Sequence, residues 1–300
     1  MRVDHDPEFL QGWINFHLDV PSWLHHYTTA GGVLGIVSDR SIFGTHHRFL
    51  NDSLEILWGQ QVIAGHIDQY IQAAEEPART TLQRFRNLQV EQYCDIYVAC
   101  FCAKDNLLSQ WRAYGRGGGY ALAFRGLDLY ECQRRQNRSL RRVIYNSSEQ
   151  DRWVRLVLDW FVDTIAAADL TDDTAQAIAA RKWAANLTWD ILCEMCALFK
   201  LEVFEEEAEW RIVELVRKKE RLSDVGNLQF RPNAGTLIPY RAFPIECEQP
   251  PSIHPLDHIT CGPTLSREEV EQSLVMFLRA KGCSGVWVNS SMIPLKVGID

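Results

Sequence analysis

A nearly continuous apolar run at residues 96–103 (IYVACFCA) constrains the fold of this chain more than any other stretch. A strand that lacks polar–apolar alternation is typically buried on both faces, and therefore lies inside a sheet. Shorter strand patterns occur before and after it, at residues 23–28, 41–45, 120–125, 209–216 and 285–288. The sequence thus predicts a central sheet that takes strands from both ends of the chain.

Two long helical patterns separate the early strands from the late ones, at residues 151–168 and 174–199. Apolar residues in the second pattern recur at spacings of three and four, which predicts one buried face, formed by Trp183, Leu187, Ile191, Met195 and Leu198. Strands, then a helical insertion at about residues 148–200, then strands again predict a single α+β domain over residues 1–300. Its sheet is expected to be mixed or antiparallel.

Shorter helices are predicted at residues 31–39, 51–70 and 107–114. The first of them should bury Val33, Leu34, Ile36 and Val37. Near the end of the chain, Ser266 and Glu269 have the spacing of a capping box, and Gly282 ends the helix that they open.

The charge balance restricts the class of protein. The chain has 31 basic and 39 acidic residues, a net charge of -8 at pH 7, which disfavours general binding to DNA or RNA. No stretch of about 18 apolar residues occurs, so we expect no membrane association. The local exception to the acidic character is a basic cluster of Arg134, Arg135, Arg138, Arg141 and Arg142.

The nine cysteines and the start of the chain indicate the compartment. The number is odd and the spacing is not that of a disulfide framework, so we expect reduced thiols in a bacterial cytoplasm. The first eight residues contain no apolar run that would predict a signal peptide. Cys193 and Cys196 have metal-like spacing but lie in an apolar helical stripe, so we expect no metal site.

The first candidate site residues lie at the end of the first strand, in the segment LHHYTT at residues 24–29. On a strand, His26 and Thr28 point to one face and Tyr27 points to the other. A neutral histidine can donate one hydrogen bond and accept another, which suits a ribose hydroxyl. The alternative is a hydrogen-bonded core histidine, with Thr28 or Thr29 capping the next helix.

The second candidate is the segment FEEEAEWRI at residues 204–212. If the strand begins by Glu207, then Glu207, Glu209 and Arg211 share one face of the sheet. Charges on a sheet face are costly to dehydrate unless they pair with one another or bind a ligand. The alternative is a solvated face with Glu–Arg pairs.

Two further segments have weaker signals. Asn51 or Asp52 has the character of a helix N-cap. The segment SQWRAY at residues 109–114 precedes glycines at 117–119, which would let the backbone approach a phosphate beside Arg112. A plain turn is the alternative there, because the chain has no Walker or dinucleotide fingerprint.

Taken in this order, the segments resemble the prokaryotic domain-of-unknown-function family 2971. The resemblance covers nearly the whole chain, and its most distinctive stretch is at residues 199–212. It rests on HYT at 26–28, FLND at 49–52 with Glu55, ACFC at 99–102, WRAY at 111–114, FK at 199–200, Phe204 with EAEWRI at 207–212, IPY at 238–240, ITCGP at 259–263 and SMIP at 291–294. The family name itself implies no activity.

A more distant resemblance links the HYT and EAE segments to the NAD-binding scaffold of ADP-ribosyltransferases. In that scaffold a histidine near the first strand holds the ribose, aromatic residues flank the nicotinamide, and a late glutamate is catalytic. The resemblance implies an enzyme that uses NAD as substrate, needs no metal, and transfers ADP-ribose to protein or RNA or hydrolyses NAD. Bacterial toxins and phage-defence effectors are biological roles that it allows.

The same resemblance implies roles for individual residues. Glu207 or Glu209 would be catalytic and stabilise the positive charge that builds on the ribose, as carboxylates do in glycosidases. His26 would position the ribose and complete the catalytic group. The other candidates would contact NAD, namely Tyr27, Thr28, Trp111, Arg112 and Tyr114, or the second substrate, namely Asn51, Asp52 and Arg211.

Two other functions stay open. One is an RNA-processing phosphotransferase or nuclease, which only the basic cluster supports. The other is a non-catalytic protein-interaction module with Trp-rich grooves. The enzyme interpretation requires that His26, Arg112 and the Glu207–Glu209 face lie around one pocket.

Overall fold

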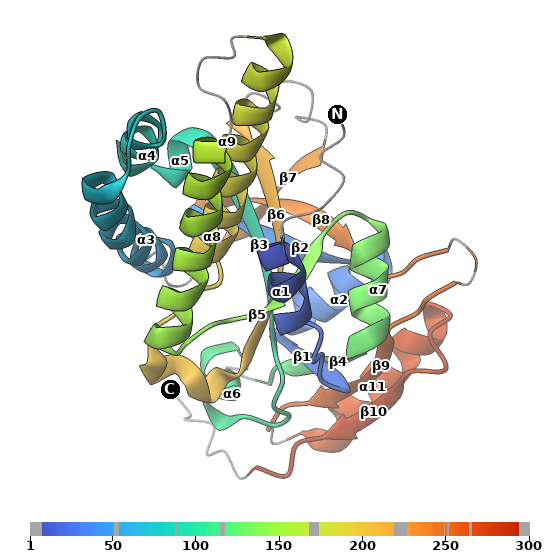
Figure 1. Cartoon of the computed structure of the whole chain (residues 1–300). Coiled ribbons are helices and arrows are strands. Elements are labelled where there is room, and N and C mark those ends of the chain that lie inside the picture. The colour runs from blue at the N-terminus through green and yellow to red at the C-terminus, as the bar shows by residue number, and fades with distance from the viewer. Residues whose placement is uncertain are drawn as a thin grey trace.

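A computed structural model of the chain (Figure 1) describes residues 8–50, 54–87, 89–114, 118–167, 174–218, 227–233, 235–248, 250, 252–263 and 266–293. Ten strands in this part of the chain form one sheet. They are β1 (Trp23–Thr28), β2 (Ser41–His46), β3 (Cys94–Cys102), β4 (Tyr120–Arg125), β5 (Ser139–Arg142), β6 (Glu209–Arg217), β7 (Leu228–Asn233), β8 (Thr236–Pro244), β9 (Leu256–Cys261) and β10 (Trp287–Ser290). The paired strands are antiparallel except for β9 and β10, which run parallel.

The strand β3, which contains most of the apolar run, lies at the centre of the sheet. The order is β10-β9-β4-β1-β3-β2-β8-β7, and β6 pairs with β3 and with β5. Since β6 occupies one edge of β3 along its whole length, β1 and β2 share the other edge. β2 pairs there with Tyr97 and Val98, whereas β1 pairs with Cys102. The two strands therefore separate between Val98 and Cys102, and we name this gap the β1–β2 split.

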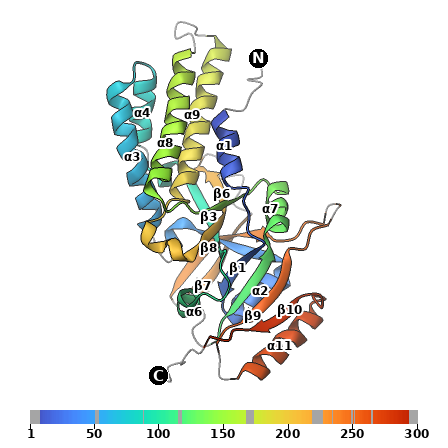
Figure 2. The same ribbon diagram turned by 60° about the horizontal axis from the view of Figure 1, so that its bottom comes forward.

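The helices gather mainly at one end of the sheet. In the described residues they are α1 (Glu8–Phe16), α2 (Ala30–Asp39), η1 (His47–Phe49), α3 (Leu54–Ala73), α4 (Ala78–Asn87), α5 (Val90–Tyr93), α6 (Leu108–Tyr114), α7 (Gly126–Arg135), α8 (Ser147–Ala167), α9 (Ala175–Cys196), η2 (Glu202–Glu207) and α11 (Arg267–Ala280). Figure 2 shows α3, α4, α8 and α9 as a helical layer at one end of the molecule, with α11 and β10 at the other. The chain thus has the α+β architecture that the order of its elements predicts.

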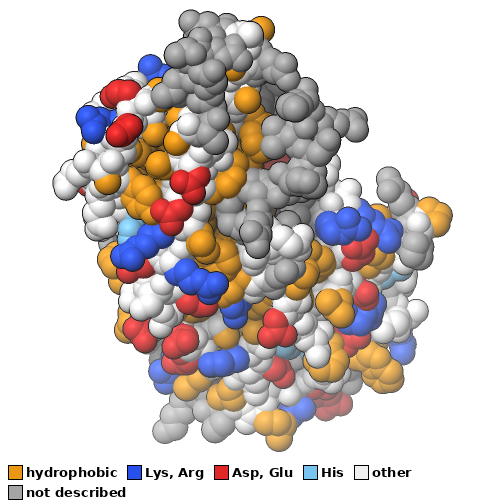
Figure 3. Space-filling view, viewed as in Figure 1, with side chains coloured by type: hydrophobic (Ala, Val, Ile, Leu, Met, Phe, Trp, Pro, Cys, Tyr) orange, Lys and Arg blue, Asp and Glu red, His pale blue; other side chains and the backbone are white. Residues whose placement is uncertain are grey.

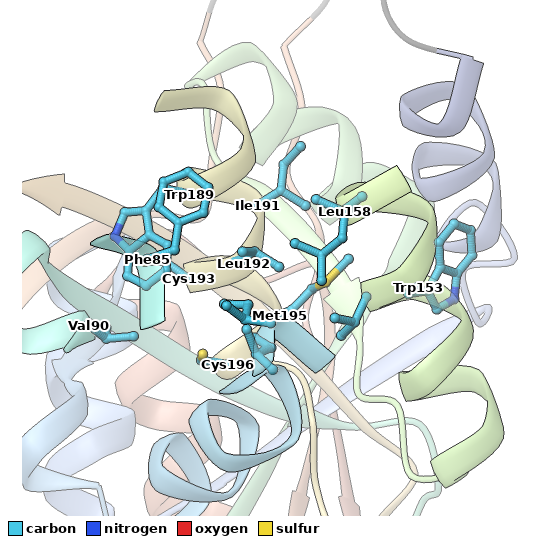
Figure 4. Packing of buried hydrophobic residues seen from close by; sticks show 14 of the residues in the cluster. Phe85, Val90, Trp153, Leu158, Trp189, Ile191, Leu192, Cys193, Met195 and Cys196 are labelled. Carbon is cyan, nitrogen blue, oxygen red and sulfur yellow. The ribbon is translucent and has the colours of Figure 1, made fainter. Parts of the chain in front are cut away.

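Alternate residues of β3 belong to two different hydrophobic clusters. Ile96 and Val98 pack with the helical layer, where Trp189 and Met195 of α9 are buried (Figure 4). Ala99 and Phe101 pack in a second cluster with residues of α2 and α11. This arrangement confirms that the apolar run is buried on both faces, because each face of β3 has its own core.

Several expectations about single residues are wrong. Leu34 is 59% exposed although Val33 and Ile36 are buried, because α2 turns only a narrow stripe toward the sheet. Trp183, in the first half of α9, is 40% exposed and contacts Trp160 of α8 edge-on at 5.9 Å. Ser266 directly precedes α11, but its side chain makes no capping hydrogen bond.

The ends of other elements also differ from the sequence patterns. The helix expected over residues 174–199 ends at Cys196, and the one expected from residue 151 begins at Ser147. The last strand covers Trp287–Ser290 rather than residues 285–288. The helix expected from residue 51 is described from Leu54 onward, and its first three residues lie outside the described part.

Gly59 allows α3 to approach the end of α9 closely. A Cβ atom at this position would lie 2.6 Å from Cys196 Cα and 2.9 Å from its carbonyl oxygen. We expect Gly59→Ala to lower the free energy of unfolding in urea by about 1–3 kcal/mol, because backbone cannot yield as a flexible side chain does. Gly65→Ala on the same helix is the control, since its Cβ would meet nothing within 4 Å. That change should be neutral or stabilise by up to about 1 kcal/mol, and equal losses in both variants would contradict the close approach.

Candidate functional site

The strand β6 begins in a group of buried charges that we name the Glu209 cluster: Lys200, Glu207, Glu209 and Arg211. Arg211, only 1% exposed, donates from Nε to Glu209 Oε1 and from Nη2 to Glu209 Oε2, both at 2.8 Å. Lys200 Nζ donates to Glu209 Oε2 at 3.0 Å and to Glu207 Oε2 at 2.6 Å. Two cations and two carboxylates therefore neutralise one another, which offsets the cost of burying them.

The backbone before β6 separates the two glutamates. Glu207 ends the 3-10 helix η2, and Ala208 then adopts a left-handed conformation with φ 43°. The strand begins at Glu209, as its alternating pattern predicts, and the condition that it begins by Glu207 is not met, because Ala208 interrupts the extended backbone. The Ala208 carbonyl accepts from Ala103 N at 2.9 Å and so fastens η2 to the end of β3. Glu209 and Arg211 do share a face of β6, but that face is buried rather than solvated.

The two glutamates differ in their remaining capacity for hydrogen bonds. Burial alone would raise the pKa of Glu209, but Arg211 and Lys200 outweigh it and lower that pKa to about 2. Its Oε2 accepts from Lys200 and Arg211, its Oε1 accepts from Arg211, and the Cys100 side chain donates a further bond, which leaves no lone pair for a ligand. Glu207 Oε1 forms no hydrogen bond with a described residue. Glu207 is therefore the carboxylate of the cluster with an oxygen available to a ligand.

Three residues that support this cluster have no role in the sequence-based hypothesis. The Tyr145 hydroxyl accepts from Glu209 N at 2.9 Å, and Cys102 Sγ donates to Glu207 O at 2.9 Å. Burial raises the pKa of both side chains, that of Cys102 to about 11, so both keep their protons at neutral pH. Lys200 belongs to the FK motif of the family resemblance, but its partners lie on η2 and β6. Local sequence therefore has no signal that shows it to be a buried cation.

A pocket of about 600 Å³ lies beside the Glu209 cluster. Its lining residues are Lys104, Arg142, Val143, Tyr145, Asn146, Glu149, Glu205, Glu206, Ala208, Glu209 and Trp210. Glu209 and Tyr145 belong to both the pocket and the cluster. Neither Lys104 nor Arg142 forms an ion pair with a described residue, and the Arg142 guanidinium lies 3.6 Å from the ring centre of Phe16. The pocket thus combines four carboxylates with two cations that form no direct ion pair with a described residue.

His26 does not reach this pocket. Its ring packs against Phe101, and Phe101 pairs with Trp210, whereas Glu209 pairs with Cys102. Since successive side chains of a strand alternate, His26 and Glu209 point to opposite faces of the sheet. Nδ1 of His26 bonds to the Cys100 carbonyl at 2.8 Å inside the β1–β2 split. Burial lowers the pKa of His26, so the ring is neutral and Nδ1 carries the proton that it donates.

The histidine on the face of Glu209 is His25, which pairs with Cys102. Tyr27 shares this face but is buried, and its hydroxyl accepts from Leu107 N at 3.0 Å and donates to Lys104 O. Trp111 packs edge-on against Tyr27 at 4.8 Å and is 1% exposed. Tyr27 and Trp111 thus anchor α6 and the loop that contains Lys104 in this structure.

The remaining predicted site residues lie apart. Arg112 and Tyr114 are exposed on α6 and do not line the pocket. Thr28 lies against Gly32 of α2, where a Cβ atom would be 1.9 Å from the Thr28 hydroxyl oxygen. Asn51 and Asp52 lie outside the described residues. The structure therefore brings Glu207, Glu209 and Arg211 together, without His26, Thr28, Arg112 or Tyr114. The convergence of His26, Arg112 and the glutamates on one pocket is not met, so an NAD site would need contacts other than the predicted ones.

The arginine-rich segment does not form a continuous basic surface. Arg134 and Arg135 pair with Glu131 on α7, Arg138 pairs with Glu214 at 3.6 Å, and Arg141 pairs with Glu194 at 3.5 Å. On the face seen in Figure 3, acidic and basic side chains are interspersed. An RNA-processing role thus loses the feature that supported it.

The described part of the chain contains neither a metal-binding cluster nor a membrane-spanning helix. Among the described residues, no group of three or more His, Cys, Asp or Glu side chains could hold a metal ion. Cys193 and Cys196 lie in the core of the helical layer (Figure 4). No helix within the described ranges is long and apolar enough to cross a membrane.

Comparison with known proteins identifies one family. Residues 110–212 match the model of a protein family of unknown function, DUF2971. This match confirms the family resemblance over about a third of the chain, and it includes Tyr145 and all four residues of the Glu209 cluster. No curated protein matches the chain, and no solved structure matches it.

Proposed function

We propose that this protein is an NAD-using enzyme of the ADP-ribosyltransferase type, which transfers ADP-ribose to a macromolecule or to water. The observation that carries the proposal is the pocket beside the Glu209 cluster. It combines two carboxylate-bearing elements, η2 and β6, with the unpaired cations Lys104 and Arg142. The distant resemblance of the EAE segment to the transferase scaffold supports the same chemistry.

The pocket suits a ligand with phosphates. Its volume of about 600 Å³ lies within the usual range for small-molecule sites. Lys104 and Arg142 line the pocket and form no ion pair with a described residue, so both can donate charge-assisted hydrogen bonds to a pyrophosphate. We assign Lys104 and Arg142 to the pyrophosphate of NAD, in place of Arg112, which lies on exposed α6.

The carboxylates suit cleavage of the bond between nicotinamide and ribose. When that bond breaks, its electron pair leaves with nicotinamide and positive charge builds on the sugar. An ionised carboxylate beside the ribose stabilises this charge. We assign that role to Glu207, which is not itself a lining residue but lies between the lining residues Glu206 and Ala208. Its Oε1 is available, while the oxygens of Glu209 are saturated. Glu209, Arg211 and Lys200 then act as positioning residues.

His26 has no contact with NAD in this proposal. The transferase resemblance implies that it holds the ribose, but its ring lies on the other face of the sheet and closes the β1–β2 split. The Tyr145 hydroxyl, which lines the pocket and accepts from Glu209 N, is the group we assign to the ribose hydroxyls. The proposed site thus depends on carboxylates, cations and one phenol.

Incubation of the purified protein with NAD tests the proposal by following nicotinamide release. We expect Glu207→Gln to reduce release by about a hundredfold or more, the usual scale for a lost transition-state contact. The matched control is Glu202→Gln on the same 3-10 helix, where the side chain is exposed and forms no described bond. It should leave release unchanged.

Other outcomes would overturn the assignment. If Glu207→Gln retains full activity, Glu207 is not the catalytic carboxylate. If the wild-type protein neither releases nicotinamide nor is stabilised by NAD in a thermal melt, NAD is not its substrate. A thermal shift by NAD without turnover would indicate binding that lacks the acceptor, and addition of bacterial lysate as a source of acceptors would then reveal transfer.

A further inference from the structure

A third cation that forms no ion pair with a described residue lies far from the pocket in the sheet order, on the edge strand β7. Arg231 donates one described hydrogen bond, from Nη2 to Thr45 Oγ1 at 3.2 Å. Its Nε is buried without a hydrogen-bond partner, and it forms no ion pair with a described residue. Arg241, on the neighbouring strand β8, pairs with Glu214 at 2.9 Å instead. Arg231 therefore shares with Arg142 of β5 a buried Nε without a hydrogen-bond partner and the lack of an ion pair with a described residue.

The environment of Arg231 is unfavourable to its charge. Burial lowers the pKa of Arg231, and the nearby Tyr240 hydroxyl only partly opposes this effect. A guanidinium has five N–H donors, so most of those on Arg231 have no described acceptor. Proteins rarely leave a buried charge uncompensated, because desolvation costs several kcal/mol unless a partner replaces water. An anion from outside the chain would meet this need.

Thr45 provides a second donor for such an anion. Its hydroxyl accepts from Arg231, so its own hydrogen is free to donate. Thr45 pairs with Val98 of β3 and with Tyr240 of β8, and its hydroxyl lies beside the guanidinium fork on that face of the sheet.

We propose that Arg231 and Thr45 form a binding site for a phosphate group. The planar guanidinium fork matches two oxygens of a phosphate, and the hydroxyl supplies a third donor. The site shares no residue with the pocket beside the Glu209 cluster, so it does not depend on the proposed NAD chemistry.

Isothermal titration of the full chain with inorganic phosphate and with pyrophosphate at low ionic strength tests this site. We expect saturable binding that weakens at least about tenfold in Arg231→Gln, since a charge-assisted hydrogen bond is worth that much or more. Thr45→Val should weaken binding less. Arg134→Gln, which removes an exposed arginine already paired with Glu131, is the control and should bind as the wild type does.

Two further measurements keep the outcome decisive. In phosphate-free buffer Arg231→Gln should melt at or above the wild-type temperature, because it removes an uncompensated charge, and phosphate should raise the melting temperature of the wild type only. Arg142→Gln distinguishes the two anion sites. If Arg142→Gln loses phosphate binding while Arg231→Gln retains it, phosphate binds in the pocket, and the proposal is overturned. Absence of saturable binding in the wild type would overturn it as well.

Discussion

Replacing Arg211 by methionine should lower the free energy of unfolding by about 3–5 kcal/mol, the usual cost of removing one partner of a buried ion pair. Glu209, which is 7% exposed, would lose the two bonds from Nε and Nη2, and the Ala197 carbonyl would lose its bond from Nη1 at 2.6 Å. Lys200 would remain as the single cation near Glu209. Urea denaturation of the wild type and variant measures the difference.

A double variant separates the buried charge from the lost packing. Adding Glu209→Gln to Arg211→Met removes the uncompensated carboxylate, so part of the lost stability should return. Arg134→Met is the surface control, because Arg134 is exposed and its pair with Glu131 should contribute less than about 1 kcal/mol. A loss below about 1 kcal/mol in Arg211→Met would contradict a structural role and would favour the contact with substrate that the resemblance implies.

The elements of the fold follow closely from sequence patterns that are local. The run at residues 96–103 shows no alternation, and the strand β3 is accordingly buried on both faces. The segments at 23–28 and 120–125 form β1 and β4 with the predicted ends. The strand predicted from residue 209 also begins there, and the left-handed backbone of Ala208 is what excludes Glu207 from it.

The candidate site was less predictable, because it depends on which faces of the strands are covered by helices and on which strands pair. The pattern correctly places Glu209 and Arg211 on one face of a strand, but nothing local shows that helices cover that face. The choice of His26 over His25 depends on register, since neighbouring positions of β1 point to opposite sides of the sheet. Tyr145 and Lys200 could not be found, because their contacts join segments that only the tertiary structure brings together.

We expect acid to unfold this protein at a pH well above the one at which protonation of its carboxylates alone would unfold it. Burial, assisted by the charges of Arg141 and Arg142, lowers the pKa of His17 to about 2, and burial lowers that of His47 to about 4. The pKa values of His25 and His26 are also lowered. The unfolded state has histidines of pKa about 6.5, so it binds more protons than the folded state below that pH. Stability is therefore present above pH 6.5 and is lost as pH falls toward 4.

His17 makes the clearest single contribution to this pH dependence. Its Nδ1 accepts from Arg142 N at 3.1 Å. A proton on Nδ1 would turn this nitrogen into a donor, so the two N–H groups would face each other without an acceptor. We expect His17→Asn, whose side-chain oxygen can accept the same bond without titrating, to reduce the stability lost between pH 6.5 and 4.5. The reduction should approach about 1.4 kcal/mol per pH unit. Urea midpoints at several pH values measure it, with His254→Asn, an exposed histidine, as the control. Parallel pH curves for the wild type and His17→Asn would show that His17 is not held neutral in the folded protein.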